Sequence, residues 1–281
     1  MSIQNSDPRL RPIRSTSATP ALERALTMSE GRATVTDDWF SWTGLQGGLL
    51  AALCLRAAVT ALDADLAPRS LTAQFLAPAA AGDLQLTIET VRAGGSSAVV
   101  AVSAGTAARA SVVAGRSRGI STLTSVTAPV VQAPEDCPDL ELPLDFVPFS
   151  QHLHFRPATA ARPLAGGDQA ELIAWVRFAD DTVTDAAALC VLVDAMPPAL
   201  YGATATPVAI PTVDLMVTFT GAHPPEPQAR EWLLVRISTR TAAAGWCVDD
   251  SDVWNRDGQL LASARQTRRV LGEWSDDGRV T

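Results

Sequence analysis

The 281-residue sequence consists of two halves that carry the same order of elements, and this repetition restricts the fold more than any single motif does. The first half contains QFLAPAAAGDLQLTIETVRAGGSSAVVAVSA, and the second contains VTFTGAHPPEPQAREWLLVRISTRTAAAGWCVDDSDVW. In both segments a Phe ends a strand-like run, a proline-containing turn follows, and an alternating strand leads through small residues into another strand. A period of about 145 residues is far too long for a solenoid. We therefore expect two copies of one supersecondary unit.

Each half is expected to begin with a helix and to continue with antiparallel strands, the pattern of a sheet wrapped around one helix in an α+β protein. The glycines Gly47 and Gly48 lead into an apolar helix of roughly four turns. In the second half an apolar helical run ends near Asp194, because Pro197 and Pro198 disfavour its continuation. We expect strands over 71–76, 84–91, 98–102 and 109–113, then over 170–178, 213–219, 232–239, 246–254 and 260–270.

The boundaries between these units follow from composition. Residues 1–30 are polar and proline-bearing, and we predict an N-terminal tail there, with one short helix near residues 21–26. Residues 31–121 form the first repeat. Residues 122–148 contain five prolines and lack either periodicity, which indicates a linker. Residues 149–281 form the second repeat.

The charge balance excludes some functions. The net charge is −8, from 22 basic and 30 acidic residues, and this argues against a nucleic-acid partner. No apolar run is long enough to span a bilayer, and the first residues lack the apolar segment of a signal peptide. We expect no membrane association and a cytoplasmic location.

The four cysteines have neither CxxC spacing nor histidines at ligand spacing, so we expect free thiols and no metal; they are Cys54, Cys137, Cys190 and Cys247. Nothing in the sequence implies a cofactor. A nucleophilic Cys190 would require a histidine base, and none is near it in the sequence, so a buried core thiol is the better interpretation.

Asp194 is the first candidate for a functional residue. A carboxylate at the end of a helix with apolar side chains on all sides is costly unless it has partners or a function. It also lies near a helix C-terminus, where the dipole disfavours negative charge. The alternative is a carboxylate that only hydrogen-bonds the following loop.

The chain resembles the double-hotdog acyl-CoA thioesterases of the type II family over about residues 36–271. The resemblance rests on GLQGGLLAALCLRAA, LVDAMPPAL, PTVDLMVTFTG and DGQLLASARQ, taken in this order within the doubled architecture. It implies two hotdog repeats, each a long helix wrapped by an antiparallel sheet. We expect the two sheets to join edge to edge into one sheet, and the chain to form a homodimer or higher oligomer.

The resemblance also implies a hydrolytic site that orders the attacking water. Position by position, the family's Asp, Thr and Gln fall on Asp194, Thr212 and Gln266. In the first half, Val113 and Ala114 stand where a Gln would be needed, so one site per chain is expected. Free N–H groups at Gly47 and Gly48, at the start of a helix, are suited to stabilising an oxyanion.

Simpler interpretations remain open for these residues. Thr212 is also a good strand former, and Gln266 could belong to a solvated face, although Ala262 and Ala264 share its face by period two. The charged groups Arg265/Arg268/Arg269 and Asp249/Asp250/Asp252 read as solvated strand edges. Hotdog dehydratases use a histidine, and none stands at either helix start.

The predicted function is hydrolysis of an acyl-CoA, or of an acyl group on a related pantetheine thiol. Two alternatives remain: a cyclase or isomerase acting on a polyketide-like acyl substrate, and an acyl-binding protein without catalysis. Geometry discriminates among them, because hydrolysis requires Asp194, Thr212 and Gln266 to lie within hydrogen-bond reach of one water.

Overall fold

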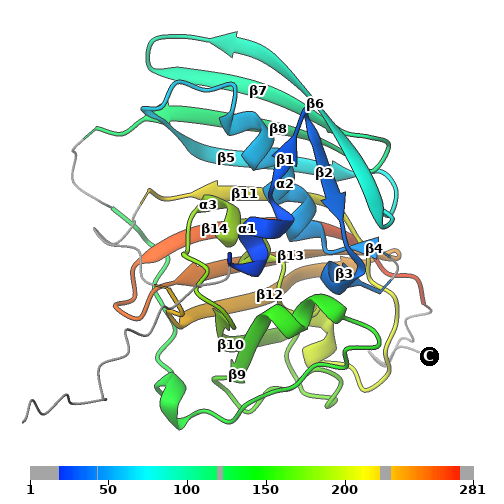
Figure 1. Cartoon of the computed structure of the whole chain (residues 1–281). Helices are drawn as coiled ribbons and strands as arrows, with labels where there is room; N and C mark the ends of the chain where they lie inside the picture. The colour runs from blue at the N-terminus through cyan, green and yellow to red at the C-terminus, as the bar shows by residue number, and fades with distance from the viewer. Residues whose placement is uncertain (1–18, 43, 119–122, 222–228, 273–281) are drawn as a thin grey trace, which may run out of the picture.

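The computed structural model describes residues 19–42, 44–118, 123–221 and 229–272 (Figure 1). The strands are β1 (Met28–Ser29), β2 (Arg32–Val35), β3 (Phe40–Ser41), β4 (Gly44–Leu45), β5 (Leu66–Phe75), β6 (Gly82–Ala93), β7 (Ser97–Ala104), β8 (Ala108–Arg116), β9 (Leu153–Pro157), β10 (Glu171–Phe178), β11 (Thr212–Phe219), β12 (Leu233–Ala243), β13 (Trp246–Trp254) and β14 (Leu260–Arg269). The α-helices are α1 (Ala21–Ala25), α2 (Gly47–Val59) and α3 (Ala186–Val193), and the 3-10 turns are η1 (Asp37–Trp39), η2 (Pro134–Asp136), η3 (Pro148–His152) and η4 (Ala199–Gly202). Every strand expected from the sequence is present; β1 to β4 and β9 were not in that list.

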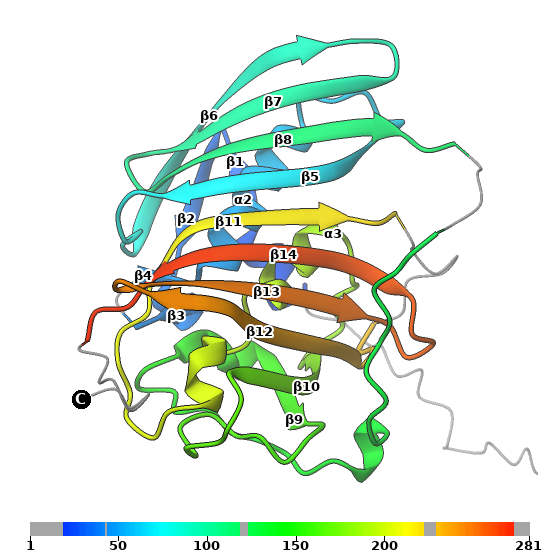
Figure 2. The ribbon, with the colours of Figure 1, turned by 180° about the vertical axis from the view of Figure 1, so that it is seen from behind.

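Twelve strands form one sheet in the order β1-β2-β6-β7-β8-β5-β11-β14-β13-β12-β10-β9. The first half of the chain supplies the strands up to β5, and the second half supplies those from β11 onwards. The halves join where β5 pairs antiparallel with β11 (Figure 2). The expectation of one continuous sheet is confirmed.

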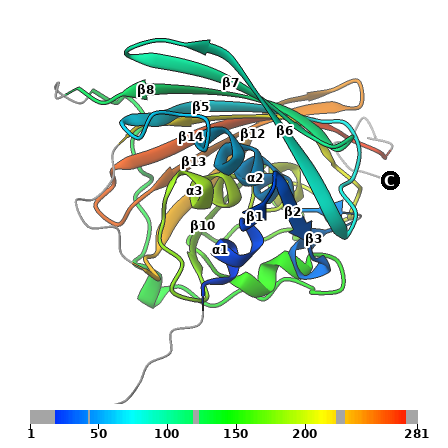
Figure 3. The same cartoon turned by 45° about the horizontal axis from the view of Figure 1, so that its top comes forward.

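The helices α2 and α3 lie together on one side of this sheet (Figure 3). They approach so closely that a Cβ on Gly48 would stand 2.4 Å from the carbonyl oxygen of Cys190. Only glycine allows this contact without a shift of one helix. The close crossing brings the start of α2, from the first half, beside the end of α3, from the second half.

The expectation of a long helix in each half is wrong for the second. Helix α2 has 13 residues, whereas α3 has 8. Asp185 caps the start of α3, where its side chain accepts the N–H of Ala188 at 2.8 Å. The helix ends at Asp194 (φ −114°, ψ 12°), three residues before the first of two prolines. The cap at Asp185 and the prolines after Asp194 therefore limit α3 to about two turns.

The predicted N-terminal tail is wrong from residue 19 onwards. The short helix expected near residues 21–26 is present as α1, and its apolar side of Leu22 and Leu26 is buried in the core. Strand β1 follows and pairs with β2. The i, i+4 spacing puts both leucines on one side of the segment, where they pack into the core. Residues 1–18 lie outside the described part.

The proline-rich linker has no long helix or strand between residues 123 and 148, as expected, but it is packed against the second half. The indole N–H of Trp175 donates to the carbonyl of Gln132 at 2.8 Å. Cys137 is buried in a cluster with Trp175 and Trp254. The linker therefore covers part of the second half of the sheet.

The pairing register relates the two halves by an approximate two-fold axis. Met216 of β11 pairs with Thr72 of β5 near the middle of the shared pair of strands. The pairing of β11 with β14 shifts between Thr212 and Asp214, and the pairing of β5 with β8 shifts between Pro68 and Ser70. These shifts fall at equivalent positions, so each half can be compared with the other residue by residue.

Candidate active site

Helix α3 places Asp194 at its carboxyl end. All side chains from Ala187 to Val193 are buried, so the helix carries no polar face that could turn the carboxylate to solvent. Asp194 keeps 10% of its side chain exposed. A carboxylate in this position needs partners, and the neighbouring elements supply them.

A bulge in β11 brings Thr212 to the same site. The bulge lies at Val213, between Thr212 and Asp214, in the pairing with β14. One extra residue reverses the alternation of side chains along a strand. Thr212 consequently faces the same side as Gln266, which the sequence pattern had placed with Ala262 and which is fully buried.

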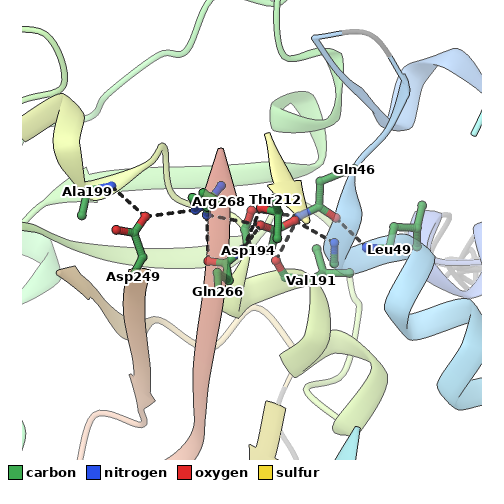
Figure 4. A network of polar contacts seen from close by, with 10 residues as sticks. Gln46, Leu49, Val191, Asp194, Ala199, Thr212, Asp249, Gln266 and Arg268 are labelled. Carbon is green, nitrogen blue, oxygen red and sulfur yellow. Dashed lines mark hydrogen bonds and ion pairs between the residues drawn. The ribbon is translucent and has the colours of Figure 1, made fainter. Parts of the chain in front are cut away.

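The structure brings the three residues predicted from the sequence into direct contact (Figure 4). The Gln266 amide Nε2 donates to Asp194 Oδ1 at 2.6 Å and to Thr212 Oγ1 at 3.3 Å. These residues come from α3, β11 and β14. The Gln266 amide thus links the carboxylate of Asp194 to the hydroxyl of Thr212.

Asp194 also contacts the start of helix α2. The N–H of Gly48 donates to Asp194 Oδ2 at 2.7 Å. The carboxylate therefore stands at the positive end of α2, which offsets its unfavourable place at the end of α3. The sequence analysis expected the N–H of Gly48 to stabilise an oxyanion. In the structure this N–H instead donates to the carboxylate of Asp194.

Gln46 ties the two helices together next to this contact. It is buried, and its amide Nε2 donates to the carbonyls of Asp194 at 3.0 Å and Val191 at 3.3 Å. Its Oε1 accepts the N–H of Leu49 at 2.7 Å and so caps α2. One side chain thus caps α2 and holds the backbone of α3 in place.

A buried ion pair behind the three predicted residues was missed by the sequence analysis. Arg268 and Asp249 are 5% and 0% exposed, which overturns their interpretation as solvated edges. Arg268 Nε lies 3.0 Å from Asp249 Oδ2, and Arg268 Nη2 donates to Gln266 Oε1 at 2.7 Å. Both charged residues belong to interior strands of the sheet, not to its edges. The signal was the even spacing of Gln266 and Arg268, which puts them on one face.

The other members of the two charged groups behave differently. Asp252 is also buried and forms an ion pair with Arg236 at 2.7 Å, so the prediction of a solvated edge is wrong for it too. Arg265 pairs with Asp250 at 2.7 Å, and its side chain is 57% exposed. Arg265 therefore has the exposed position that the prediction gave it.

The pKa of Asp194 is raised above the usual value of an aspartic acid. Burial is the largest cause, since it penalises the charged form. The positive charge of Arg268, the N–H of Gly48 and the Gln266 amide act in the opposite direction. The carboxyl is therefore a stronger base than an exposed aspartate, while its partners still favour ionisation.

The remaining candidate nucleophiles are unsuited to catalysis. The four cysteines are free and buried, as expected. Burial raises the pKa of the Cys190 thiol, which keeps it protonated. His152 stacks on Trp39 at 4.1 Å between ring centroids, and its Nε2 lies 3.1 Å from Asp38 Oδ2; His223 lies outside the described residues. Among the described residues no cluster of His, Cys, Asp and Glu could hold a metal ion.

The first half carries apolar residues at the positions equivalent to this site. By the register, Thr212 corresponds to Pro68, Gln266 to Val112, Arg268 to Ala114 and Asp249 to Val100. The position equivalent to Gln266 is thus Val112, which corrects the sequence-based assignment to Val113 and Ala114. Val112, Val100 and Ala114 are fully buried.

Two cavities formed by described residues have volumes of about 400 and 430 Å³, and neither is lined by the predicted site residues. The first lies between α1, β6 and the end of α2; the second lies near Trp42 and η3. Among the described helices, none has the length and apolar character needed to cross a membrane.

Comparison with solved structures defines the class of fold. A protein of Alicyclobacillus acidocaldarius with the hotdog fold and unknown function is similar over 91% of this chain and 100% of its own, with 26% identity and a TM-score of 0.83. The acyl-CoA thioesterase II TesB2 of Mycobacterium marinum is similar over 89% and 98%, with 21% identity and a TM-score of 0.70. The tesB protein MAP1729c of Mycobacterium avium subs paratuberculosis matches over the same shares, with 16% identity and a TM-score of 0.69. The chain therefore has a hotdog fold.

The family follows from the sequence models. The acyl-CoA thioesterase N-terminal domain matches residues 35–128, and the acyl-CoA thioesterase C-terminal domain matches residues 134–270. A comparison with curated protein sequences gave no match. The chain belongs to the acyl-CoA thioesterase family and is a thioester hydrolase.

Proposed function

We propose that the chain hydrolyses acyl-CoA, or an acyl group on a related pantetheine thiol, by direct attack of a water that Asp194 activates. One observation carries this proposal: the carboxylate of Asp194, the hydroxyl of Thr212 and the amide of Gln266 meet at one place in a chain of the acyl-CoA thioesterase family. They come from three elements that the sequence separates widely.

Hydrolysis of a thioester requires an activated water and a stabilised oxyanion, but little protonation of the leaving group. A thiolate leaves readily, since a free thiol has a pKa near 8.5, so the leaving group needs little protonation. Asp194 accepts a proton from the water as the oxygen attacks the thioester carbon. Thr212 Oγ1 already accepts an N–H from Gln266, which leaves its own hydrogen to orient the water. The proton on Asp194 then passes to the departing sulfur or to solvent.

The positive end of the α2 dipole stabilises the negative charge of the oxyanion. Gly48 N–H binds Asp194 and Leu49 N–H binds the Gln46 side chain, so we assign the oxyanion to the N–H of Gly47. An added Cβ on Gly47 would stand 3.0 Å from Asp194 Oδ2 and 3.2 Å from Phe75 Cζ. A side chain at position 47 would therefore crowd the carboxylate, and glycine avoids this.

We also propose that the architecture is a double hotdog, with repeats over residues 31–121 and 149–281. The shared position of the strand bulges and the single join between β5 and β11 support it. Members of such a fold that expose a broad sheet face have a surface for self-association, and a homodimer or higher oligomer is expected.

The experiment is thiol release from a series of acyl-CoAs of increasing chain length, followed with a thiol reagent. Release well above the buffer rate for at least one acyl length is the expected result. Binding of acyl-CoA that leaves the thioester intact would favour an acyl-binding protein. Failure to bind any pantetheine thioester would favour a cyclase or isomerase that uses the same fold.

A further inference from the structure

The buried pair Arg268–Asp249 has no part in the mechanism as described, although it touches the site. Asp249 lies on β13 and is fully buried, and it accepts the hydroxyl of Thr239 at 2.7 Å. The N–H of Ala199, in η4, donates to its second oxygen at 3.4 Å. A buried ion pair is a weak source of stability, so its position against Gln266 calls for another explanation.

We propose that Arg268, held in place by Asp249, is a positioning residue that fixes the Gln266 amide and favours the ionised form of Asp194. This inference rests on the proposed function, since it concerns the same site. The two parts of the role, orientation and charge, follow from separate observations.

The orientation follows from the donors that Arg268 carries. A guanidinium has N–H donors and no acceptor, so only the oxygen of the Gln266 amide can face it. The contact between Arg268 Nη2 and Gln266 Oε1 is 2.7 Å. With its oxygen held there, the amide must turn its NH₂ group toward Asp194 and Thr212. Without Arg268, the amide could rotate and present its oxygen to the carboxylate, which would repel it.

The charge acts on Asp194 from 3.6 Å, the distance between Arg268 Nη2 and Asp194 Oδ1. The other groups near Asp194 are neutral: the N–H of Gly48 at the start of α2, the amide of Gln46 just before α2, and Thr212 from β11. Cys190 lies one turn earlier on α3. Behind Arg268 lie Asp249, Cys247 and Tyr201. Arg268 is thus the nearest charge among the described groups, and Asp249 partly cancels it.

The test is the pH dependence of kcat/KM, whose acidic limb reports the carboxyl that must be ionised. Arg268→Gln removes the positive charge, so the limb is expected to move to higher pH by about one unit or more. Asp249→Asn leaves the positive charge less balanced, and the limb is expected to move to lower pH. Arg268→Lys keeps the charge without the planar fork, so its limb should stay near the wild-type position while kcat falls.

Arg265→Gln is the matched control, because Arg265 lies on the same strand but faces solvent. Its acidic limb should be that of the wild type. If the pair had a purely structural role, both variants would have lower thermal stability. The acidic limbs of Arg268→Gln and Asp249→Asn would then not move in opposite directions. If the limb of Arg268→Gln coincides with that of the wild type, the inference is overturned.

Folding of the variants is checked by circular dichroism. If Arg268→Gln does not fold, the double variant Arg268→Met, Asp249→Leu replaces the pair with apolar side chains, a change that buried pairs tolerate. An upward shift of its acidic limb supports the inference, and an unchanged limb overturns it. Full activity of Asp194→Asn would instead remove the proposed site itself.

Discussion

At the residue scale, Asp194 combines burial with partners from both halves of the chain. The N–H of Gly48 comes from the first half, and the amide of Gln266 comes from the second. Each bond occupies one carboxylate oxygen, and each oxygen retains a further lone pair. A water can therefore be held without breaking the bonds that orient the carboxylate.

Thr212→Val tests the hydroxyl that orients the water. Valine keeps the shape and the strand preference, so the fold should be unaffected. We expect kcat/KM to fall by about 10-fold to 100-fold, the effect of one lost hydrogen bond in the transition state. Steady-state kinetics measures it. Thr218→Val, on the exposed side of the same strand, serves as control and should match the wild type. Equal rates for both variants would contradict the role of Thr212.

The raised pKa of Asp194 predicts where activity is lost in acid. The base is the ionised carboxylate, so activity falls as the pH drops through the pKa of this group. Because burial raises that pKa, the loss should begin at a higher pH than for an exposed aspartate, whose pKa is about 3.9. A kcat/KM profile from pH 4 to pH 8 measures it, with protein stability followed in parallel. A flat profile down to about pH 4 would contradict this environment.

The sequence predicted three residues of the proposed site and missed two that contact it. Asp194, Thr212 and Gln266 were assigned through the resemblance to a known family, and the Gln266 amide contacts the other two side chains. Arg268 and Asp249 were assigned to solvent because charged residues are rarely buried alone. Only the pairing of β13 with β14 shows that they face each other on interior strands. The even spacing of Gln266 and Arg268 puts these two residues on one face, but the pairing of Arg268 with Asp249 across strands leaves no local signal.

At the scale of elements, the site depends on how closely α2 crosses α3. Gly48→Ala places a Cβ 2.4 Å from the Cys190 carbonyl and 2.9 Å from Val191 Cα, both of them backbone atoms. One helix must shift, at a cost of about 1–3 kcal/mol in the free energy of unfolding. We expect a lower melting temperature together with a loss of activity, because the N–H of residue 48 moves away from Asp194.

The matched control for this change is Gly95→Ala. A Cβ at Gly95 meets no atom within 4 Å, so stability and activity should remain close to those of the wild type. Thermal unfolding followed by circular dichroism, with kinetics on the same samples, makes the comparison. A Gly48→Ala variant as stable and active as Gly95→Ala would show that the close crossing of the helices is not required.

Local sequence signals located the elements well but not their irregularities. Alternation of apolar residues predicted the long strands, and the prolines after Asp194 predicted the end of α3. The bulge at Val213 contains no glycine or proline from which it could have been predicted. It nevertheless directs the side chain of Thr212 to the same face as Gln266. The length of α3 also escaped prediction, because a cap at Asp185 was not distinguished from the acidic residues before it.

At the scale of the whole molecule, the two halves have equivalent strand pairings, but they carry different side chains at the positions of the proposed site. The positions equivalent to Gln266, Arg268 and Asp249 are occupied by Val112, Ala114 and Val100. The repetition was visible in the sequence, so the doubled order of elements was predicted. The sequence did not predict which residues of the two halves are equivalent, because the equivalence depends on the strand register.

This asymmetry predicts one binding site per chain. Titration calorimetry with a non-hydrolysable thioether analogue of an acyl-CoA substrate should give a stoichiometry of one. The apolar positions around Val112 offer no group to activate a water. A stoichiometry of two would show that the first half also binds substrate.

The central claim is that Asp194 activates the water, and Asp194→Asn tests it most directly. Asparagine keeps the size of the side chain but cannot accept the proton. Asp214→Asn, half-buried on β11 and hydrogen-bonded to Gln74, is the control. The measurement is thiol release from the best acyl-CoA substrate. We predict that Asp194→Asn loses about two or more orders of magnitude in kcat while Asp214→Asn retains its rate. Activity that survives in a folded Asp194→Asn protein would contradict the account.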